Sequence, residues 1–324
     1  MCRRYLLLLV AFWAVTQSCG CRALGLPSPL ASFERSQVYH PVAYPIGDWE
    51  PEGLEFEDVW IKPAREQRVH GWFVPCENPR AVILFAHGNA GNVTHRTPFL
   101  KLLHDRHRVA VLSFDYRGFG RSTDIKLSEK TCLQDARAAR KWLAKRMKIQ
   151  ETDIVMMGRS FGGGIAVDLA ANDGAAGLVL DSTFTSLPDV AEGFFPWLPV
   201  QTLMENRLDS LSKVGQYQGP LVQSHGDADR VVPYELGRRL YDAAPGRKRF
   251  VTLEGGGHHD SQGEEYHQAL DDLFESLTPV TELHKRYAYV RPPIAVCSGG
   301  TPCHSPHLVP NGTKIVPVPD FDSR

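Results

Sequence analysis

The sequence lacks the features that mark several large classes of protein. Its formal net charge is −1 and it has no block of basic residues, which excludes an electrostatic footprint for nucleic acid. No apolar run reaches the roughly 18 residues needed to cross a bilayer. No C-x-x-C pair or His/Cys cluster has the spacing of a structural zinc site. We therefore expect no nucleic-acid partner, no metal and no cofactor, and a small molecule or peptide as the substrate.

The length and composition indicate one domain with additional segments at both ends. A chain of 324 residues, 43% apolar and 23% charged, suffices for a globular domain of about 220 to 260 residues. Residues 1–23 have the pattern of an export signal, because Arg3 and Arg4 precede an apolar run from Tyr5 to Val15 and short polar residues follow. The expected location is therefore the periplasm, the cell envelope or the extracellular space.

Cysteines leave two alternatives open at this end of the chain. Cys19 or Cys21 is a candidate for the lipid-modified cysteine of a lipoprotein signal, and an uncleaved segment would act as an anchor. Either would hold the protein at a membrane surface. Cleavage near Ala23 would leave Cys76, Cys132, Cys297 and Cys303, of which the last two are spaced to close a small loop.

Strand and helix signals alternate along residues 53–277, between a lead-in of residues 24–52 and a proline-rich tail of residues 278–324. Continuous apolar runs indicate strands that are buried on both faces, at residues 81–86, 109–114, 154–157, 177–180, 221–224 and 249–253, after two edge strands at 54–61 and 69–75. Helices are expected at residues 128–148, 161–171, 234–243 and 264–277. This pattern predicts an α/β fold with a doubly wound, mostly parallel sheet and a short lid, residues 182–219, after the sixth strand. We expect the tail to be extended and weakly ordered.

The segment Gly158-Arg159-Ser160-Phe161-Gly162 directly follows an apolar run and has the pattern of a nucleophile elbow. In such a turn a strand passes abruptly into a helix, and glycine on both sides of the serine avoids collisions with the neighbouring backbone. The amide of Phe161 at the helix N-terminus would be one donor of an oxyanion hole. The loop after the strand at 81–86 offers a second donor, either Asn89 or Ala90.

Partners for Ser160 are expected beyond the carboxyl ends of other strands, where parallel sheets gather their functional loops. Asp227 and Asp229 both follow the seventh strand, and we select Asp229, although spacing alone does not separate the two. Three glycines after the last strand free the backbone to present an imidazole, for which His258 is preferred to His259. The following Asp260 is expected to cap the final helix.

The order serine, aspartate, histidine along the chain is the order of a catalytic triad on this type of sheet. His258 would accept the proton of Ser160 as the serine attacks an acyl carbon, and Asp229 would orient the imidazole. The pattern therefore predicts a serine hydrolase that cleaves an ester, a thioester or an amide through an acyl-enzyme.

Six motifs occur in one order: H-G-N-A-G-N at 87–92, D-Y-R-G-F-G at 115–120, G-R-S-F-G-G at 158–163, D-S-T-F-T-S at 181–186, H-G-D-A-D-R-V-V-P at 225–233 and G-G-G-H-H-D at 255–260. With these motifs the chain resembles the α/β-hydrolases, in the serine aminopeptidase-like and depalmitoylase-like branch. The resemblance implies Ser160 as nucleophile, Asp229 as acid and His258 as base. Thr183 stands where similar proteins often have proline, which we expect to affect local rigidity.

The lid carries aromatic residues that we expect to line an acyl-binding pocket, namely Phe184, Phe195 and Trp197. Arg117 is expected to be structural, bonded to Asp115 or to backbone carbonyls, and Arg159 to form an outward salt bridge. Asn92 begins an N-x-T sequon, as Asn311 does. We expect Asn92 to be unmodified because a glycan there would block the cleft.

Two other functions remain as alternatives. An aminopeptidase would need acidic groups for the amine of its substrate, and Glu192 and Glu205 in the lid are the candidates. A non-catalytic binding protein on a hydrolase scaffold would be expected to lack at least one of the three triad residues, all of which are present.

Overall fold

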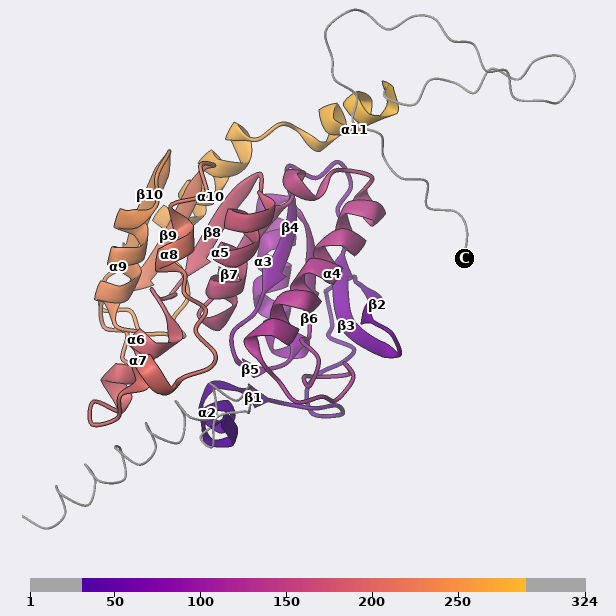
Figure 1. Cartoon of the computed structure of the whole chain (residues 1–324). Coiled ribbons are helices and arrows are strands. Elements are labelled where there is room, and N and C mark those ends of the chain that lie inside the picture. The colour runs from indigo at the N-terminus through magenta and orange to yellow at the C-terminus, as the bar shows by residue number, and fades with distance from the viewer. Residues whose placement is uncertain (1–30, 290–324) are drawn as a thin grey trace, which may run out of the picture.

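The computed structural model describes residues 31–289, which form a twisted sheet covered by helices on both faces (Figure 1). The predicted export signal, Cys19, Cys21, Cys297, Cys303 and Asn311 lie outside the described residues. Eight strands form the sheet in the order β10-β9-β8-β7-β4-β6-β3-β2. All neighbouring strands are parallel except β3, which runs antiparallel to both β2 and β6. The strands are β2 Glu57–Ala64, β3 Gln67–Val74, β4 Val82–Ala86, β6 Ala110–Phe114, β7 Val155–Arg159, β8 Gly177–Asp181, β9 Leu221–Gly226 and β10 Lys248–Leu253.

Strands β4, β6, β8 and β9 are buried at every position, because helices cover both faces of the sheet. Along β4, Leu84 packs into one hydrophobic core, whereas its neighbours Ile83 and Phe85 pack into a second core on the opposite face. The first core includes residues of α4 Glu129–Met147, α5 Phe161–Asp173 and α9 Tyr234–Ala243, and the second includes residues of α3 Thr97–His107 and α10 Glu264–Ser276. The predicted doubly wound α/β fold is therefore confirmed.

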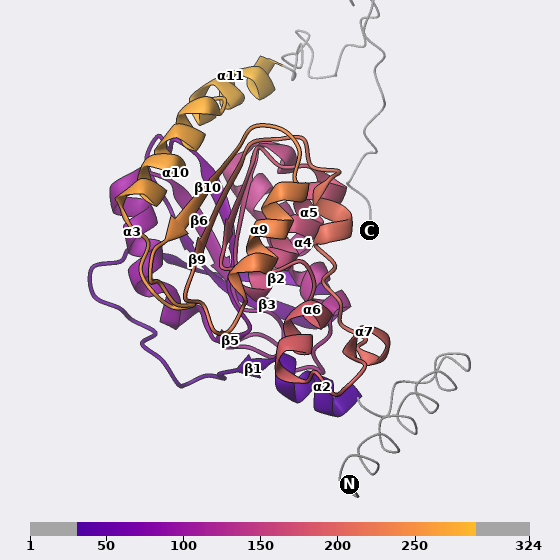
Figure 2. The same cartoon turned by 90° about the vertical axis from the view of Figure 1, so that its left-hand side faces the viewer.

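Two further parts of the chain lie together at the edge of the sheet where the parallel strands end (Figures 1 and 2). The lid contains α6 Leu187–Phe194, α7 Val200–Leu203 and α8 Leu211–Val214. The lead-in contains α2 Ala31–Val38 and the short strand β1 His40–Pro41, which pairs with β5 Ala90–Gly91. Single-turn 3₁₀ helices, η1 Val93–Arg96 and η2 Glu151–Asp153, precede α3 and β7.

All the predicted strands and helices of the domain are present, with ends that differ by up to three residues. Helices α6, α7 and α8 lie within the segment that was predicted as a lid, whereas α2, α3 and α11 Val280–Tyr289 lie outside every predicted strand, helix and lid. The expectation of an extended tail from residue 278 is therefore wrong for its first part. Val280 and Leu283 are buried against the domain, and the hydroxyl of Tyr287 donates to the Asp153 carboxylate at 2.7 Å. These tertiary contacts stabilise a helix that ends before the prolines of the tail begin.

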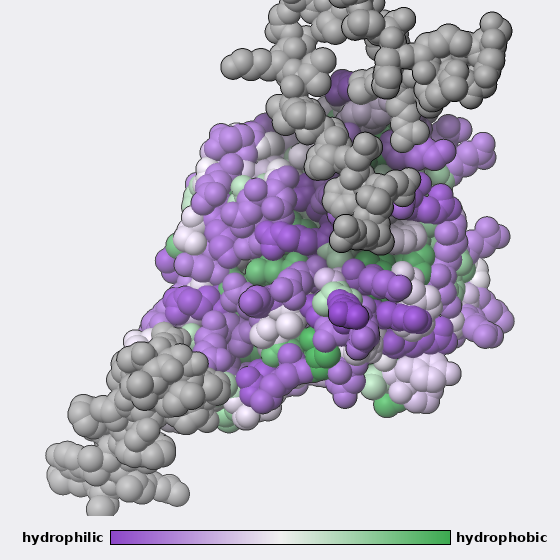
Figure 3. All heavy atoms as spheres, turned by 45° about the vertical axis from the view of Figure 1, so that its right-hand side comes forward, coloured by the Kyte–Doolittle hydropathy of each residue, from purple (hydrophilic) through white to green (hydrophobic). Residues whose placement is uncertain are grey.

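Hydrophilic side chains predominate on the face seen in Figure 3, where hydrophobic ones form small separate areas. Within residues 31–289, no helix has the length and apolar character needed to cross a membrane.

The sheet and helix α5 approach each other unusually closely beside Ser160. A Cβ atom on Gly158 would overlap the Gly162 carbonyl, and one on Gly162 would overlap the carbonyl oxygen of Ala86 in β4. Because the obstacles are backbone atoms, no side-chain rotation would relieve the overlap. Glycine at both positions is thus required for α5 to begin where it does.

We predict that Gly162→Ala destabilises the protein by about 3 kcal/mol, since α5 would have to move away from β4. Gly193→Ala is the matched control, because a Cβ on this glycine of α6 meets nothing within 4 Å. Because alanine has a greater helix propensity than glycine, Gly193→Ala should stabilise the protein by about 0.5 to 1 kcal/mol. Denaturant unfolding of the two variants measures both effects, and equal stabilities would contradict the steric argument.

Candidate active site

Ser160 lies between the end of β7 and the start of α5 with φ 53° and ψ −119°, a conformation that is strained for a residue with a side chain. Three hydrogen bonds to the backbone of Ser160 hold this conformation. Its N–H donates to the Asp181 carbonyl at 2.8 Å, and its own carbonyl accepts from the Gly163 N–H and the Thr183 hydroxyl, both at 2.9 Å. The strained turn raises the side chain above the end of the sheet, as a nucleophile elbow requires.

A chain of two short contacts runs from Ser160 through His258 to Asp229. Nε2 of His258 lies 3.0 Å from Ser160 Oγ, and its Nδ1 lies 2.7 Å from Asp229 Oδ2. The other carboxylate oxygen, Oδ1, accepts from the N–H groups of Val231 at 2.8 Å and Val232 at 2.9 Å. The three side chains are largely buried, so bulk water competes little for these bonds.

The environment keeps Asp229 ionised. Burial alone would raise the pKa of Asp229, but hydrogen bonds from His225, from His258 and from the Val232 N–H outweigh burial and hold the pKa below its ordinary value. A carboxylate that remains charged beside Nδ1 favours a proton on that nitrogen. It thereby leaves Nε2 as the acceptor that faces Ser160.

The neighbouring candidates lie outside this chain of contacts. Asp227 is exposed and accepts from the Gly255 N–H at 2.7 Å, whereas the exposed His259 packs against the edge of the His258 ring. The expectation that Asp260 caps the final helix is wrong. Helix α10 begins at Glu264, and the Asp260 carboxylate instead accepts from the Gly257 N–H at 2.8 Å, within the glycine loop that presents His258.

Arg159 supports the same loop. Its Nη2 donates to the backbone carbonyl of His258 at 2.7 Å, in place of the expected outward salt bridge. Arg117 is structural as expected, but its carboxylate partner is Asp135 and not Asp115. The Arg117 Nε lies 2.5 Å from Asp135 Oδ1, and both side chains are buried.

The candidate oxyanion donors lie on either side of Ser160. Phe161 is the first residue of α5, where the N–H groups have no carbonyl partner within the helix. On the other side, a Cβ on Gly88 would lie 3.7 Å from the Ser160 Cβ, so the loop with Asn89 and Ala90 passes close to the serine. Ala90 pairs with His40 of β1.

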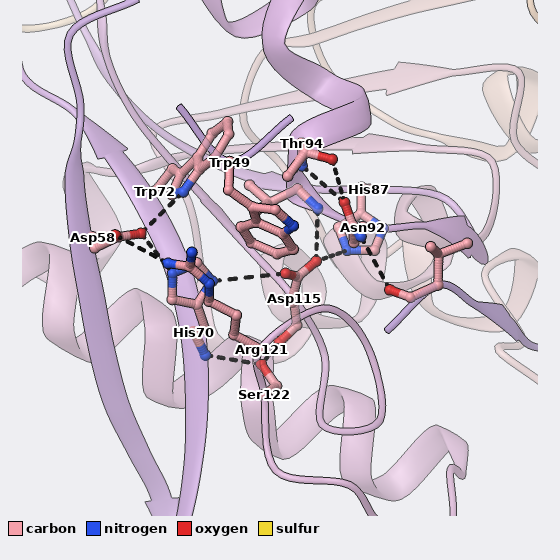
Figure 4. A network of polar contacts seen from close by, with 12 residues as sticks. Trp49, Asp58, His70, Trp72, His87, Asn92, Thr94, Asp115, Arg121 and Ser122 are labelled. Carbon is pink, nitrogen blue, oxygen red and sulfur yellow. Dashed lines mark hydrogen bonds and ion pairs between the residues drawn. The ribbon is translucent and has the colours of Figure 1, made fainter. Parts of the chain in front are cut away.

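A buried network of polar side chains supports the loop that contains Asn89 and Ala90 (Figure 4). The Asp115 carboxylate accepts from the Val93 N–H at 2.7 Å and lies between the imidazoles of His70 and His87, at 3.8 and 3.5 Å. Burial alone would raise the pKa of Asp115, but the two imidazoles outweigh burial and lower it. The loop is therefore fixed to β6 by a buried charge.

Asn92 belongs to the same network and is fully buried. Its amide nitrogen donates to the carbonyls of Val42 and Ile46, and its oxygen accepts from Thr94. A glycan could not be attached to an amide in this position, which supports the expectation that Asn92 is unmodified.

An apolar cavity of about 380 Å³ adjoins the candidate oxyanion loop, between α2 and the lid. Phe195 lines it, as expected. Phe184 and Trp197 differ from the expectation, because neither belongs to its lining among the described residues. Phe184 is buried in the core, and Trp197 is 53% exposed with its ring edge against Phe195. The volume lies within the usual range for small-molecule pockets.

Comparisons with known proteins agree with this architecture. The model of the alpha/beta hydrolase family matches residues 83–217. The mouse alpha/beta hydrolase domain-containing protein 17C is 31% identical over 235 residues, which cover 71% of each chain. The chain belongs to the alpha/beta hydrolase family. An uncharacterized protein of Mycobacterium tuberculosis is 33% identical over 78% of this chain and 90% of its own.

Solved structures resemble this one at low sequence identity, which shows the fold alone. An esterase of Pyrococcus furiosus has a TM-score of 0.59 and 18% identity, and the match covers 74% of this chain and 99% of that one. Est1E of Butyrivibrio proteoclasticus, solved with ferulic acid bound, has a TM-score of 0.52 and 20% identity over 67% and 96% of the chains.

Two residues of this alpha/beta hydrolase support the site through contacts that sequence reasoning did not assign. Thr183, in the position where similar proteins often have proline, supplies the hydroxyl that holds the Ser160 carbonyl. Tyr39, in the lead-in, packs its ring against Phe161 with a centroid distance of 5.5 Å. Both contacts join residues far apart in the chain, and only the folded structure reveals them.

Asp181 yields a prediction about pH. Its buried carboxylate accepts from the hydroxyls of Ser224 and Tyr266, both at 2.9 Å, and burial raises its pKa. A raised pKa in the folded state means that stability from this group is full below the unfolded value of about 3.9 and is lost as the pH rises through the folded value.

We therefore predict that Asp181→Asn gains stability relative to the unsubstituted protein between pH 4 and pH 7. Asparagine keeps one acceptor oxygen for one of the two hydroxyls, presents its NH₂ group to the oxygen of the other, and cannot ionise. Urea unfolding of both proteins across this range gives the difference, in which the titration of all other groups cancels. A difference that stays constant with pH, or that moves the other way, would contradict the prediction.

Proposed function

We propose that this alpha/beta hydrolase is a serine hydrolase that cleaves a carboxylic ester, a thioester or an amide through an acyl-enzyme on Ser160. The observation that carries the proposal is the position of His258, with Nε2 at 3.0 Å from the Ser160 hydroxyl and Nδ1 at 2.7 Å from the Asp229 carboxylate. This is the arrangement of nucleophile, base and orienting acid that acyl transfer requires.

In the proposed reaction, Ser160 Oγ attacks the acyl carbon while His258 Nε2 takes the hydroxyl proton. The amides of Phe161 and of Asn89 or Ala90 stabilise the oxyanion that develops, and Asp229 stabilises the imidazolium. His258 then protonates the leaving oxygen, sulfur or nitrogen as its bond to the acyl carbon breaks. A water molecule then attacks the acyl carbon while His258 takes its proton. His258 returns this proton to Ser160 Oγ as the bond between Oγ and the acyl carbon breaks and the acid is released.

The surroundings favour an apolar acyl group. The cavity beside the candidate oxyanion loop is lined mainly by aliphatic and aromatic side chains, among them Leu187, Val190, Phe195 and Leu203. The fold is also shared with proteins described as esterases. A short lid and a pocket of this size suit a small-molecule ester, thioester or amide with an apolar acyl group.

The alternative activities have less support. Glu192 and Glu205 do not line the cavity among the described residues, so neither is placed to hold the amine of a peptide. A non-catalytic binding protein would have no need for the complete chain of contacts from Ser160 to Asp229. Aminopeptidase activity and binding without turnover therefore serve as the alternatives that experiment must separate.

We also propose that the protein acts outside the cytoplasm. The support comes from the sequence of residues 1–23, which lie outside the described part of the chain. A mature N-terminus near Leu24 in protein recovered from the medium or the cell envelope would support this location. An intact N-terminus on protein confined to the cytosol would refute it.

We predict that Ser160→Ala and His258→Ala each lower kcat for p-nitrophenyl esters by about 10⁴-fold or more and abolish labelling by a fluorophosphonate probe, because the three residues act as a unit. Asp229→Asn should lower kcat by about 10⁴-fold, since the amide favours the wrong tautomer of His258. His259→Ala and Asp227→Asn are the matched controls and should retain activity and labelling.

Aminoacyl anilides, assayed in parallel, separate an esterase from an aminopeptidase. If folded protein is neither labelled nor active on any of these substrates, the serine-hydrolase proposal fails and binding without turnover becomes the better account.

A further inference from the structure

The lead-in helix α2 forms one wall of the apolar cavity. Figure 2 places α2 beside α6 and α7 of the lid, and the cavity lies between them. Helix α2 contributes Phe33, Glu34, Gln37 and Val38 to the lining. The ring of Phe33 meets the edge of Phe195 across the cavity, at a centroid distance of 6.0 Å. The pocket is therefore incomplete without a segment that lies outside the predicted hydrolase domain.

Glu34 ties this wall to the lid. One carboxylate oxygen accepts from the backbone N–H of Asn206 at 2.6 Å and from its side-chain amide at 2.7 Å, and the other accepts from the Glu205 N–H at 2.9 Å. Glu34 is only 7% exposed, so these charge-assisted bonds are shielded from water. Both oxygens of the carboxylate therefore bond the lid. We call these three hydrogen bonds between Glu34 and residues 205 and 206 the Glu34 clamp.

The side chain of Asn206 also forms hydrogen bonds with two other parts of the chain. Its side-chain oxygen accepts from the hydroxyl of Tyr39, just beyond α2, at 2.9 Å and from the N–H of Glu129 at the start of α4 at 2.7 Å. The lid is thus held at one buried residue by both the lead-in and the main domain.

The end of the lead-in also reaches the candidate oxyanion hole. The side-chain amide of Asn89 donates to the Val38 carbonyl at 2.5 Å, and the Asn89 carbonyl accepts from the His40 N–H at 2.8 Å. These bonds lie one helical turn beyond Glu34. The clamp and the support of the oxyanion loop are therefore separate contacts of the same segment.

We propose that α2 is a wall of the acyl pocket and that the Glu34 clamp determines the length of acyl chain that the hydrolase accepts. This inference rests on the proposed function. The cavity reaches the site at Asn89 and Val231, which belong to its lining. With α2 held against the lid, an acyl chain that passes from Ser160 by these residues into the cavity is buried, and each buried methylene group favours binding by roughly four-fold. When the clamp is released, the far end of the cavity opens to water and the advantage of a longer chain is lost. An acetyl group is too short to depend on that wall.

The test is the kcat/KM of p-nitrophenyl acetate, butyrate and octanoate for the unsubstituted protein and for Glu34→Ala. We expect the octanoate-to-acetate ratio to fall by about 10-fold in the variant, while kcat/KM for acetate changes by less than about three-fold. Asn206→Ala, which removes the side-chain bond on the other side of the clamp, should lower the same ratio. Glu34→Gln keeps one acceptor oxygen and should give an intermediate ratio.

Ser36→Ala is the matched control on α2. The Ser36 side chain is exposed and lies outside the cavity lining, and its hydroxyl bonds within its own helix, donating to the Phe33 carbonyl at 2.7 Å and accepting from the Gln37 side-chain amide at 3.4 Å. Its chain-length profile should equal that of the unsubstituted protein.

Two results would overturn the inference while the proposed function stands. One is an equal fall in kcat/KM for acetate and for octanoate in Glu34→Ala and Glu34→Gln, which would mean that the clamp is a purely structural contact. The other is an unsubstituted protein that hydrolyses acetate and octanoate equally well. Ester hydrolysis that survives Ser160→Ala would instead refute the proposed function, and the inference with it.

Discussion

The site depends on one close contact, that of the first turn of α5 with the end of β4. Gly162 lies against the Ala86 carbonyl without room for a Cβ atom, and this contact fixes where the helix begins. Ser160 can then occupy its strained conformation, since hydrogen bonds to Asp181, Gly163 and Thr183 hold the backbone on both sides of it. The strain is local, and the packing of the two apolar cores offsets it.

The sheet accounts for most of what could be predicted from the sequence. Parallel strands that are buried on both faces require continuous apolar runs, so the end of each strand can be located in the sequence. Functional side chains gather in the loops that follow these ends. The placement of Asp229 and His258 near Ser160 follows from this geometry. Spacing could not separate Asp229 from Asp227, because the choice depends on which carboxylate bonds the backbone N–H groups of Val231 and Val232 and which bonds Gly255.

Elements whose position depends on distant residues could not be predicted in this way. Helix α2 is short, and what holds it in place includes Asn206, more than 160 residues away. Helix α11 likewise forms against residues of the domain, although the prolines beyond it suggested an extended tail. The aromatic residues of the lid illustrate the same limit. Composition indicates that the segment is apolar, but it does not predict that Phe184 is buried in the core whereas Trp197 is exposed.

The lid also shows how a stretch without regular structure, residues 205–208 between α7 and α8, is kept in place. Backbone N–H groups in such a segment need partners, and here two carboxylates supply them: Glu34 bonds residues 205 and 206, and Glu129 bonds Arg207 and Leu208. These carboxylates come from opposite sides, one from the lead-in and one from α4. A lid fixed in this way has little freedom to open as a unit, so access to the cavity depends on the side chains at its rim. The lead-in is therefore better regarded as a third component of the site, beside the sheet and the lid, than as a linker that precedes the domain.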